Sequence, residues 1–422
     1  MNFSKKTLKN GLRVITIPKP DSLATTVLVL VEAGSKYETK EINGLSHFLE
    51  HMCFKGTTKR PTALDIAGEL DGLGAEYNAF TSQEWTGYYA KVQNEHKDKA
   101  LDVISDLYLN PVFNLVEIEK EKGVVIEELN MYEDTPQRKV QDLFSECLYG
   151  DQPAGWDVGG KKEIIQKLNR EDFLKYRGEH YVAKATIIVA AGAVDEKWLL
   201  PQIEKHFVGI SNAPKFGKLK TQEAQEKPAL LVKFKESDQT HLVLGVRAFD
   251  AFDERRYAGE VLADILGGGM SSRLFQRVRE ELGAAYYVNA SLDLYSDHGY
   301  FAVSAGVDHK KLEIVIKAIL EELMKIASNS LTDKELHRAK DHLSGRMTLG
   351  LETSDALALF YGGQEVLKRE VATPEEVLKK IHSVTKEDIV GLAKEIFKNS
   401  GLNMSLIGPY KDKAPLEKIL RF

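Results

Sequence analysis

The sequence is poor in cysteine and has no long apolar run. Its 422 residues include two cysteines, Cys53 and Cys147, too few for a disulfide framework or a cysteine-based zinc site, so we expect a reducing compartment. The longest apolar runs, around 27–31 and 187–191, are far shorter than the roughly 20 residues that a membrane-spanning helix needs. The first residues lack the apolar stretch of a signal peptide. We therefore expect a cytoplasmic protein with no signal peptide and no transmembrane segment.

The chain also lacks an excess of positive charge. It carries 57 basic and 63 acidic residues, for a net charge of −6, which leaves no basic footprint for binding a phosphate backbone. Neither nucleic acid nor a membrane is expected as a partner. Because single hydrophobic cores stop growing beyond about 250–300 residues, a chain of this length is expected to form two domains.

Apolar periodicity predicts an α+β fold. Runs bounded by turn residues predict strands, and apolar residues spaced by three and four predict helices. The expected strands are 12–17, 24–31, 76–79 and 86–92, and the expected helices are 44–54, 63–73, 97–109 and 115–132.

The second half of the chain repeats the first in outline. The segment 74–79, followed by Gly87 and a helix at Lys97, has an echo in 283–290, Gly299 and a helix at Lys310, at an offset of about 210 residues. Residues 211–227 are rich in Lys, Glu and Gln without apolar periodicity, which is typical of a solvated linker. We therefore predict two duplicated domains, 1–210 and 228–422, joined by the linker 211–227.

A possible metal site lies in the expected helix 44–54. His47 and His51 are separated by about 40° around a helix, and Glu50 lies on the flank of the same face. Two imidazoles, a third protein ligand and an open position for water form a catalytic zinc site, and a nearby carboxylate can take the proton of that water. The alternative is that two surface histidines fall near a glutamate by chance. The flanking sequence favours the metal site.

The segment 44–57, which contains His47, Glu50 and His51, resembles the inverted zinc motif of the pitrilysin family. This family includes insulysin, the mitochondrial processing peptidase and bacterial peptidases of about this length. The resemblance covers nearly the whole chain. It implies a zinc endopeptidase with Zn²⁺ bound by His47 and His51 and with Glu50 as the catalytic base.

The resemblance also implies a second, glutamate-bearing helix, which matches 121–136. Counting from His51 places Glu128 at the third zinc ligand. Helix geometry supports this count, because Glu121 and Glu128 share a face within about 20°, whereas Glu127 points roughly 100° away. We assign Glu121 to orienting a ligand and keep Glu127 as the alternative ligand. Glu119 and Glu133 of the same helix are better explained as solvated carboxylates.

The segment 74–81 resembles the strand on which this family binds substrate. An exposed edge strand offers unpaired backbone groups, so an extended peptide can add to it. Asn78 and Ala79 are the expected substrate contacts. The alternative is an interior strand followed by a polar turn.

The second half has no zinc motif, because the equivalent segment 258–266 contains no histidine pair. It does contain Arg279 and Tyr286, which match the family's substrate-binding pair. Arg279 can hold a peptide carbonyl, and the Tyr286 hydroxyl can donate to the oxyanion of the tetrahedral intermediate. The glycine triplet 267–269 is not a phosphate loop, because it lacks the Lys-Ser/Thr end and follows a helical segment.

The resemblance implies two α+β domains, each a mixed, largely antiparallel sheet with packed helices. It further implies a homodimer that closes around a chamber, in which each active site combines the zinc of one chain with Arg279 and Tyr286 of the other. The expected substrates are peptides or unfolded segments. The alternatives are a non-catalytic presenting subunit of the same fold, and a chain that is active only beside a different, inactive partner.

Overall fold

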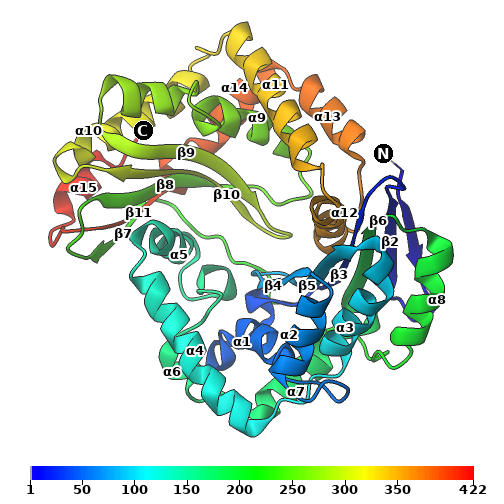
Figure 1. The fold of residues 1–422 in the computed structure, drawn as a ribbon. Helices are drawn as coiled ribbons and strands as arrows, with labels where there is room; N and C mark the ends of the chain where they lie inside the picture. Colours follow the sequence, from blue (N-terminus) through cyan, green and yellow to red (C-terminus); the bar gives the residue numbers. More distant parts are fainter. Residues whose placement is uncertain (1) are drawn as a thin grey trace. The chain divides into compact units, whose positions relative to one another are not determined.

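A computed structural model describes residues 2–422 (Figure 1). The chain forms two compact units, and each is assembled from three separate segments. Unit 1 contains 1–130, 157–219 and 348–374, and unit 2 contains 131–156, 220–347 and 375–422. No helix of residues 2–422 is both long and apolar enough to cross a membrane.

Unit 1 is built on a six-stranded mixed sheet. Its strand order is β1-β2-β6-β3-β5-β4, in which β2 and β6 pair in parallel and the other neighbours are antiparallel. The strands are β1 (Ser4–Thr7), β2 (Arg13–Pro18), β3 (Ala24–Val31), β4 (Glu76–Thr81), β5 (Thr86–Gln93) and β6 (Thr186–Gly192).

Helices cover both faces of this sheet. One face packs into a large apolar core with most of the unit's helices, and the other face packs against α12 (Figure 1). Burial on both faces explains why β3 and β6 are nearly continuous apolar runs. The helices on the large core are α1 (Leu45–Cys53), α2 (Ala63–Gly72), α3 (Lys97–Leu109), α4 (Leu115–Glu133), α6 (Lys162–Ile165), α7 (Arg170–His180) and α8 (Glu196–His206), and α12 spans Ser354–Lys368.

Unit 2 is built on a five-stranded sheet in the order β7-β11-β8-β10-β9. One face packs against α5 (Pro136–Tyr149), and the other forms a core with α9, α10 and α14. The strands are β7 (Ala229–Phe234), β8 (Thr240–Ala248), β9 (Ala285–Leu294), β10 (Gly299–Val307) and β11 (Leu402–Gly408). The helical segments are α9 (Arg256–Gly267), the π-helical η6 (Phe275–Glu281), α10 (Leu312–Ala327), α11 (Asp333–Gly350), α13 (Pro374–Ser383), α14 (Lys386–Ile396) and α15 (Ala414–Ile419).

The duplication predicted from the sequence is confirmed by the strand topology. The order β2-β6-β3-β5-β4 of unit 1 corresponds strand for strand to β7-β11-β8-β10-β9 of unit 2, and each sheet has one parallel pair, β2 with β6 and β7 with β11. Both sheets are mixed and largely antiparallel, as expected. Strand β1 is an addition at one edge of unit 1.

The units differ from the contiguous domains expected at 1–210 and 228–422. The helix α5, from the first half of the chain, covers one face of the sheet of unit 2. The helix α12, from the second half, covers one face of the sheet of unit 1. Apolar periodicity shows that a helix has a buried face but not which sheet that face covers. Sequence composition therefore does not predict that α5 belongs to unit 2 and α12 to unit 1.

The expected linker 211–227 also differs from a purely solvated segment. Lys215 forms an ion pair with buried Glu32, and Lys218 forms one with buried Glu84, both within unit 1. The first part of the segment is therefore bound to unit 1. Its lysines, which look solvated in the sequence, add a second cation to carboxylates that already pair with a buried one, Glu32 with Arg13 and Glu84 with Lys36.

Candidate metal centre

The helix α1 places two histidines on one face. Its other face is buried in the core of unit 1 through Leu45, Phe48, Leu49 and Met52, whose spacing of three and four residues makes this segment an amphipathic helix. His47 and His51 are one turn apart, and their ring centroids are separated by 4.7 Å. Both rings are partly exposed.

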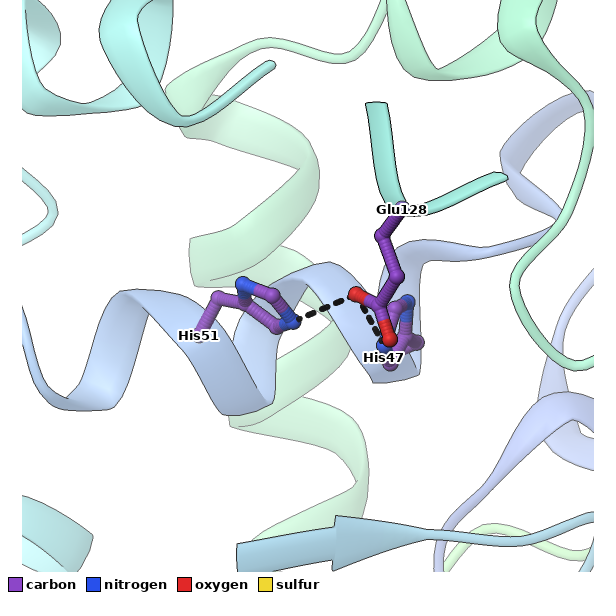
Figure 2. Close-up of side chains that lie close together, drawn as sticks. All are labelled: His47, His51 and Glu128. Atoms are coloured by element: carbon purple, nitrogen blue, oxygen red, sulfur yellow. Dashed lines mark ion pairs between the residues drawn. The ribbon is translucent and has the colours of Figure 1, made fainter. Parts of the chain in front are cut away.

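Glu128 of α4 completes the group, as Figure 2 shows. Its Oε2 atom lies 3.5 Å from Nε2 of His47 and 3.4 Å from Nε2 of His51. One ligand atom from each of the three residues lies within 4.8 Å of the others. One carboxylate oxygen is thus nearly equidistant from two imidazole nitrogens.

These separations fit a zinc ion. Zinc binds imidazole nitrogen and carboxylate oxygen at about 2.0–2.2 Å in tetrahedral geometry, which places neighbouring donor atoms about 3.3–3.5 Å apart. The observed 3.4 and 3.5 Å match this spacing and exceed the usual 2.7–3.2 Å range of an N–H···O hydrogen bond. Three protein ligands of this kind leave one position open, as in catalytic zinc sites.

The structure distinguishes the two adjacent glutamates of α4. Glu128 faces His47 and His51, whereas Glu127 is exposed to solvent. The rotation of about 100° between neighbouring helix positions accounts for the difference. Glu128 is therefore the residue placed to bind a metal with the two histidines.

Glu121 contacts His51 from the side opposite to Glu128. Its Oε1 lies 2.9 Å from His51 Nδ1, and its Oε2 lies 2.7 Å from Lys55 Nζ. Because an ionised carboxylate only accepts hydrogen bonds, Nδ1 of His51 is the donor, and Nε2 then presents its lone pair toward Glu128 when the ring is neutral. The predicted orienting position of Glu121 corresponds to this contact.

The charges around His51 affect its pKa and that of Glu121. Burial lowers the pKa of His51, but the hydrogen bond to Glu121 and the charges of Glu50, Glu121 and Glu128 outweigh it and raise the pKa above its usual value. Burial raises the pKa of Glu121, but its hydrogen bonds to His51 and Lys55 prevail and lower it. The Glu121 carboxylate is thus held in its ionised form.

Glu50 lies on α1 next to His51. Burial raises the pKa of Glu50, a hydrogen bond from Thr81 and the charge of His51 oppose this rise, and the charge of Glu128 adds to it. Glu50 is three positions after His47 and directly before His51 on α1, which places it beside the metal-binding group. A partly desolvated carboxylate with a raised pKa suits a general base.

The start of α1 is fixed by a buried carboxylate, Glu38, which no motif in the sequence indicates. Gly44 precedes the helix with φ of 98°, and a Cβ there would lie 2.6 Å from the carbonyl oxygen of Gly159. Glu38 is almost fully buried and accepts hydrogen bonds from Gly44 N, Ser46 N, Ser46 Oγ and Asn43 Nδ2. Burial nevertheless raises the pKa of Glu38 to about 7, against these hydrogen bonds, which lower it.

The strand β4 is an edge strand, so the alternative of an interior strand is wrong. The Asn78 side chain is exposed, the Ala79 side chain is buried, and the Ala79 N–H donates to Asn78 Oδ1 at 2.9 Å. The last residue of β4, Thr81, donates to Glu50 at 2.5 Å. The substrate contacts assigned to Asn78 and Ala79 stay predictions.

In unit 2, Arg279 and Tyr286 lie together. Arg279 belongs to η6 and Tyr286 to β9, and the Arg279 guanidinium carbon lies 5.6 Å from the centroid of the Tyr286 ring. The same guanidinium lies 4.9 Å from the ring of Phe275. Tyr286 is 74% exposed, so its hydroxyl is accessible. The stacking confirms that the two residues are neighbours, and their role in binding stays a prediction.

Three residues of the site were missed in the sequence. Lys55 is four positions after His51, the spacing of one helical turn. Thr81 is two positions after Ala79 and therefore on the same face of the strand. Glu38 lies in a short loop. The spacing was a usable signal for Lys55 and Thr81. Glu38 accepts hydrogen bonds from the start of the helix. It lies in a loop, where no periodic pattern of residues predicts such a contact.

Comparisons with known proteins agree with this geometry. The family profile described as "Insulinase (Peptidase family M16)" matches residues 13–161, and "Peptidase M16 inactive domain" matches 167–343. The "Uncharacterized zinc protease YmxG" of Bacillus subtilis (strain 168) is 36% identical over 407 residues, covering 96% of this chain and 98% of that protein. The chain belongs to peptidase family M16.

A second M16 relative covers a similar extent. The "Uncharacterized zinc protease SCO5738" of Streptomyces coelicolor is 36% identical over 418 residues, covering 97% of this chain and 90% of that protein. Both relatives are named zinc proteases, which agrees with the donor set of His47, His51 and Glu128. All three lie within the part that the insulinase profile matches.

Solved structures share the M16 fold. A protease from Helicobacter pylori superposes with a TM-score of 0.90 at 23% identity, over 97% of this chain and 99% of that one. A protein from Pseudomonas fluorescens, described as a peptidase M16 inactive domain, also has a TM-score of 0.90, at 18% identity. At these identities the likeness establishes the fold alone.

Proposed function

We propose that this protein is a zinc-dependent endopeptidase that hydrolyses peptides or unfolded protein segments. The observation that carries the proposal is the convergence of His47, His51 and Glu128 at zinc-ligand spacing, with Glu50 on the same helix. Zinc-protease relatives at 36% identity over nearly the whole chain support it.

Each residue of the group has a role in the proposed reaction. His47, His51 and Glu128 hold Zn²⁺, which, when bound, supplies a Lewis acid and lowers the pKa of a water to about 7. Glu50 accepts the proton of the attacking water and delivers it to the leaving amine. Glu121 and Lys55 keep the His51 ring in the orientation that ligation needs.

Substrate binding is assigned to β4. An extended peptide would pair with this edge strand, with Asn78 and Ala79 as contacts, and the pairing would fix the register of the scissile bond. Such binding uses backbone groups and therefore requires an unfolded segment. We expect cleavage of an unstructured peptide and resistance of the same sequence within a stable domain, measured by comparing the two digestion rates.

The active site is proposed to be shared between two copies of the chain. By the family resemblance, two chains close around a chamber, and Arg279 and Tyr286 of one copy would hold the substrate carbonyl and the oxyanion at the zinc of the other. An isologous dimer builds two such sites with one association.

A presenting subunit without activity is the other candidate of the same fold. Loss of a ligand or of the base would favour it, but His47, His51 and Glu128 lie close together, and Glu50 is present on the helix that carries both histidines. The intact group favours the catalytic function.

The test combines metal removal with a variant of the base. Chelation should abolish peptide hydrolysis, and one equivalent of Zn²⁺ per chain should restore it. Glu50→Gln should bind zinc as the wild type does and lose activity, because it removes the base and not a ligand. Full activity of Glu50→Gln, or of the metal-free protein, would refute the proposed function.

A further inference from the structure

Thr81 makes a short hydrogen bond to the proposed base. The Thr81 hydroxyl lies 2.5 Å from Oε2 of Glu50, which connects the end of β4 to α1. Hydrogen bonds to an ionised carboxylate are short and about twice as strong as neutral ones. Within residues 2–422, Thr81 is the side chain that hydrogen-bonds Glu50.

The strand fixes where the Thr81 hydroxyl lies. Side chains alternate along β4, so Ala79 and Thr81 share one face and Phe80 lies on the other. Ala79 packs into the core that includes Leu49 and Met52 of α1, whereas Phe80 packs in the cluster that includes α12. The alternation therefore directs Thr81 toward α1, where Glu50 is partly buried.

This contact restricts a side chain that is otherwise free to rotate. A glutamate has three rotatable bonds, and ordering such a side chain costs up to about 1.5–2 kcal/mol of conformational entropy. A donor at Oε2 holds the carboxylate in one orientation and leaves Oε1 available to accept a proton. A base within hydrogen-bond reach of the water needs such an orientation.

We propose that Thr81 is a positioning residue that orients Glu50 for proton transfer, so that the edge strand which would bind the peptide also aligns the base. The inference rests on the proposed function. It assigns to Thr81 an effect on kcat, whereas zinc affinity and KM do not depend on it.

The test uses a variant of nearly the same shape. Thr81→Val keeps the β-branched side chain and removes the donor, so kcat should fall about 10- to 100-fold with KM unchanged. Thr81→Ser restores a hydroxyl and should return kcat to within about threefold of the wild type. Zinc affinity, measured by competition with a chromophoric chelator, should be the same in all three proteins.

The control is a second threonine of the same sheet. Thr25 on β3 is buried and donates to Asn94 Oδ1 at 3.1 Å, so Thr25→Val also removes a side-chain hydrogen bond. This variant should keep wild-type kcat and KM. An equal loss of kcat in Thr25→Val and Thr81→Val would assign the effect to the sheet and overturn the positioning role.

A double-mutant cycle separates this inference from the proposed function. In a Glu50→Gln background, assayed at high enzyme concentration, Thr81→Val should change the residual rate less than twofold, because no base is left to orient. Wild-type kcat in Thr81→Val, or loss of zinc affinity, would refute the role of Thr81. Neither result would affect the role of Glu50, which Glu50→Gln tests alone.

Discussion

Arg13 on β2 and Glu365 on α12 are 352 positions apart in the chain, yet Nη1 of Arg13 lies 3.1 Å from Oε1 of Glu365. Both side chains are almost fully buried, and Glu32, which directly follows β3, also pairs with Arg13. This ion pair binds the helix from the second half of the chain to the sheet of unit 1. The ion pair thus helps to fix the position of α12 on that sheet.

Breaking this pair should destabilise the protein strongly. Arg13→Met removes the buried cation that Glu32 and Glu365 share and leaves them only the more exposed Lys215, Arg369 and Lys5. Removal of one member of a buried pair costs up to about 3–5 kcal/mol. The exposed pair between Lys413 and Glu417 is the control, and Lys413→Met should change the free energy of unfolding by less than about 0.5 kcal/mol. Urea denaturation of both variants measures the difference, and equal stabilities would contradict the importance of the buried pair.

Glu121→Gln should weaken zinc binding without abolishing it. The amide keeps the size of the side chain but loses the charge that holds Nδ1–H of His51 and Lys55. Loss of such a partner usually lowers metal affinity about 10- to 100-fold. Chelator competition measures the affinity, and an unchanged value would mean that Glu121 does not orient His51.

The adjacent glutamates of α4 should behave differently. Glu128→Gln removes the carboxylate that faces both histidines and should lose most zinc from the purified protein, whereas Glu127→Gln alters an exposed side chain and should retain the metal and most activity. Metal analysis after gel filtration distinguishes them. Zinc loss from Glu127→Gln alone would show that α4 is rotated by one position.

The strands and helices between 12 and 132 and the two histidines of the metal group could be predicted from the sequence because their signals are local, whereas Glu128 was assigned through the family resemblance. The predicted boundaries of the strand 24–31 and the helix 97–109 agree with β3 and α3, since turn residues bound both segments. The histidine spacing within one helix is likewise local. The position of α12 and the buried contacts of Glu38 could not be predicted, because both depend on residues that only tertiary packing brings together.

Glu38 should make stability depend on pH. Its pKa is about 7 in the folded protein against 4.5 when exposed, so the folded state retains a proton that the unfolded state loses first. The resulting stabilisation is full below pH 4.5 and is lost as the pH rises to about 7, by up to about 3 kcal/mol. Urea denaturation of the metal-free wild type and Glu38→Gln at pH 5 and pH 8 measures it. The wild type should lose stability relative to Glu38→Gln at pH 8, and an equal difference at both pH values would contradict the titration.

Complementation tests whether two chains share each active site. A Glu50→Gln chain keeps its Arg279 and Tyr286, and an Arg279→Ala/Tyr286→Phe chain keeps its zinc chemistry. If the sites are composite, a mixed dimer has one site with both parts intact, so activity should rise well above that of either parent when subunits exchange. If each chain supplied its own Arg279 and Tyr286, every site in the mixture would carry a defect. No gain in activity, in a mixture whose exchange is verified by pull-down of one tagged chain, would therefore exclude the shared site.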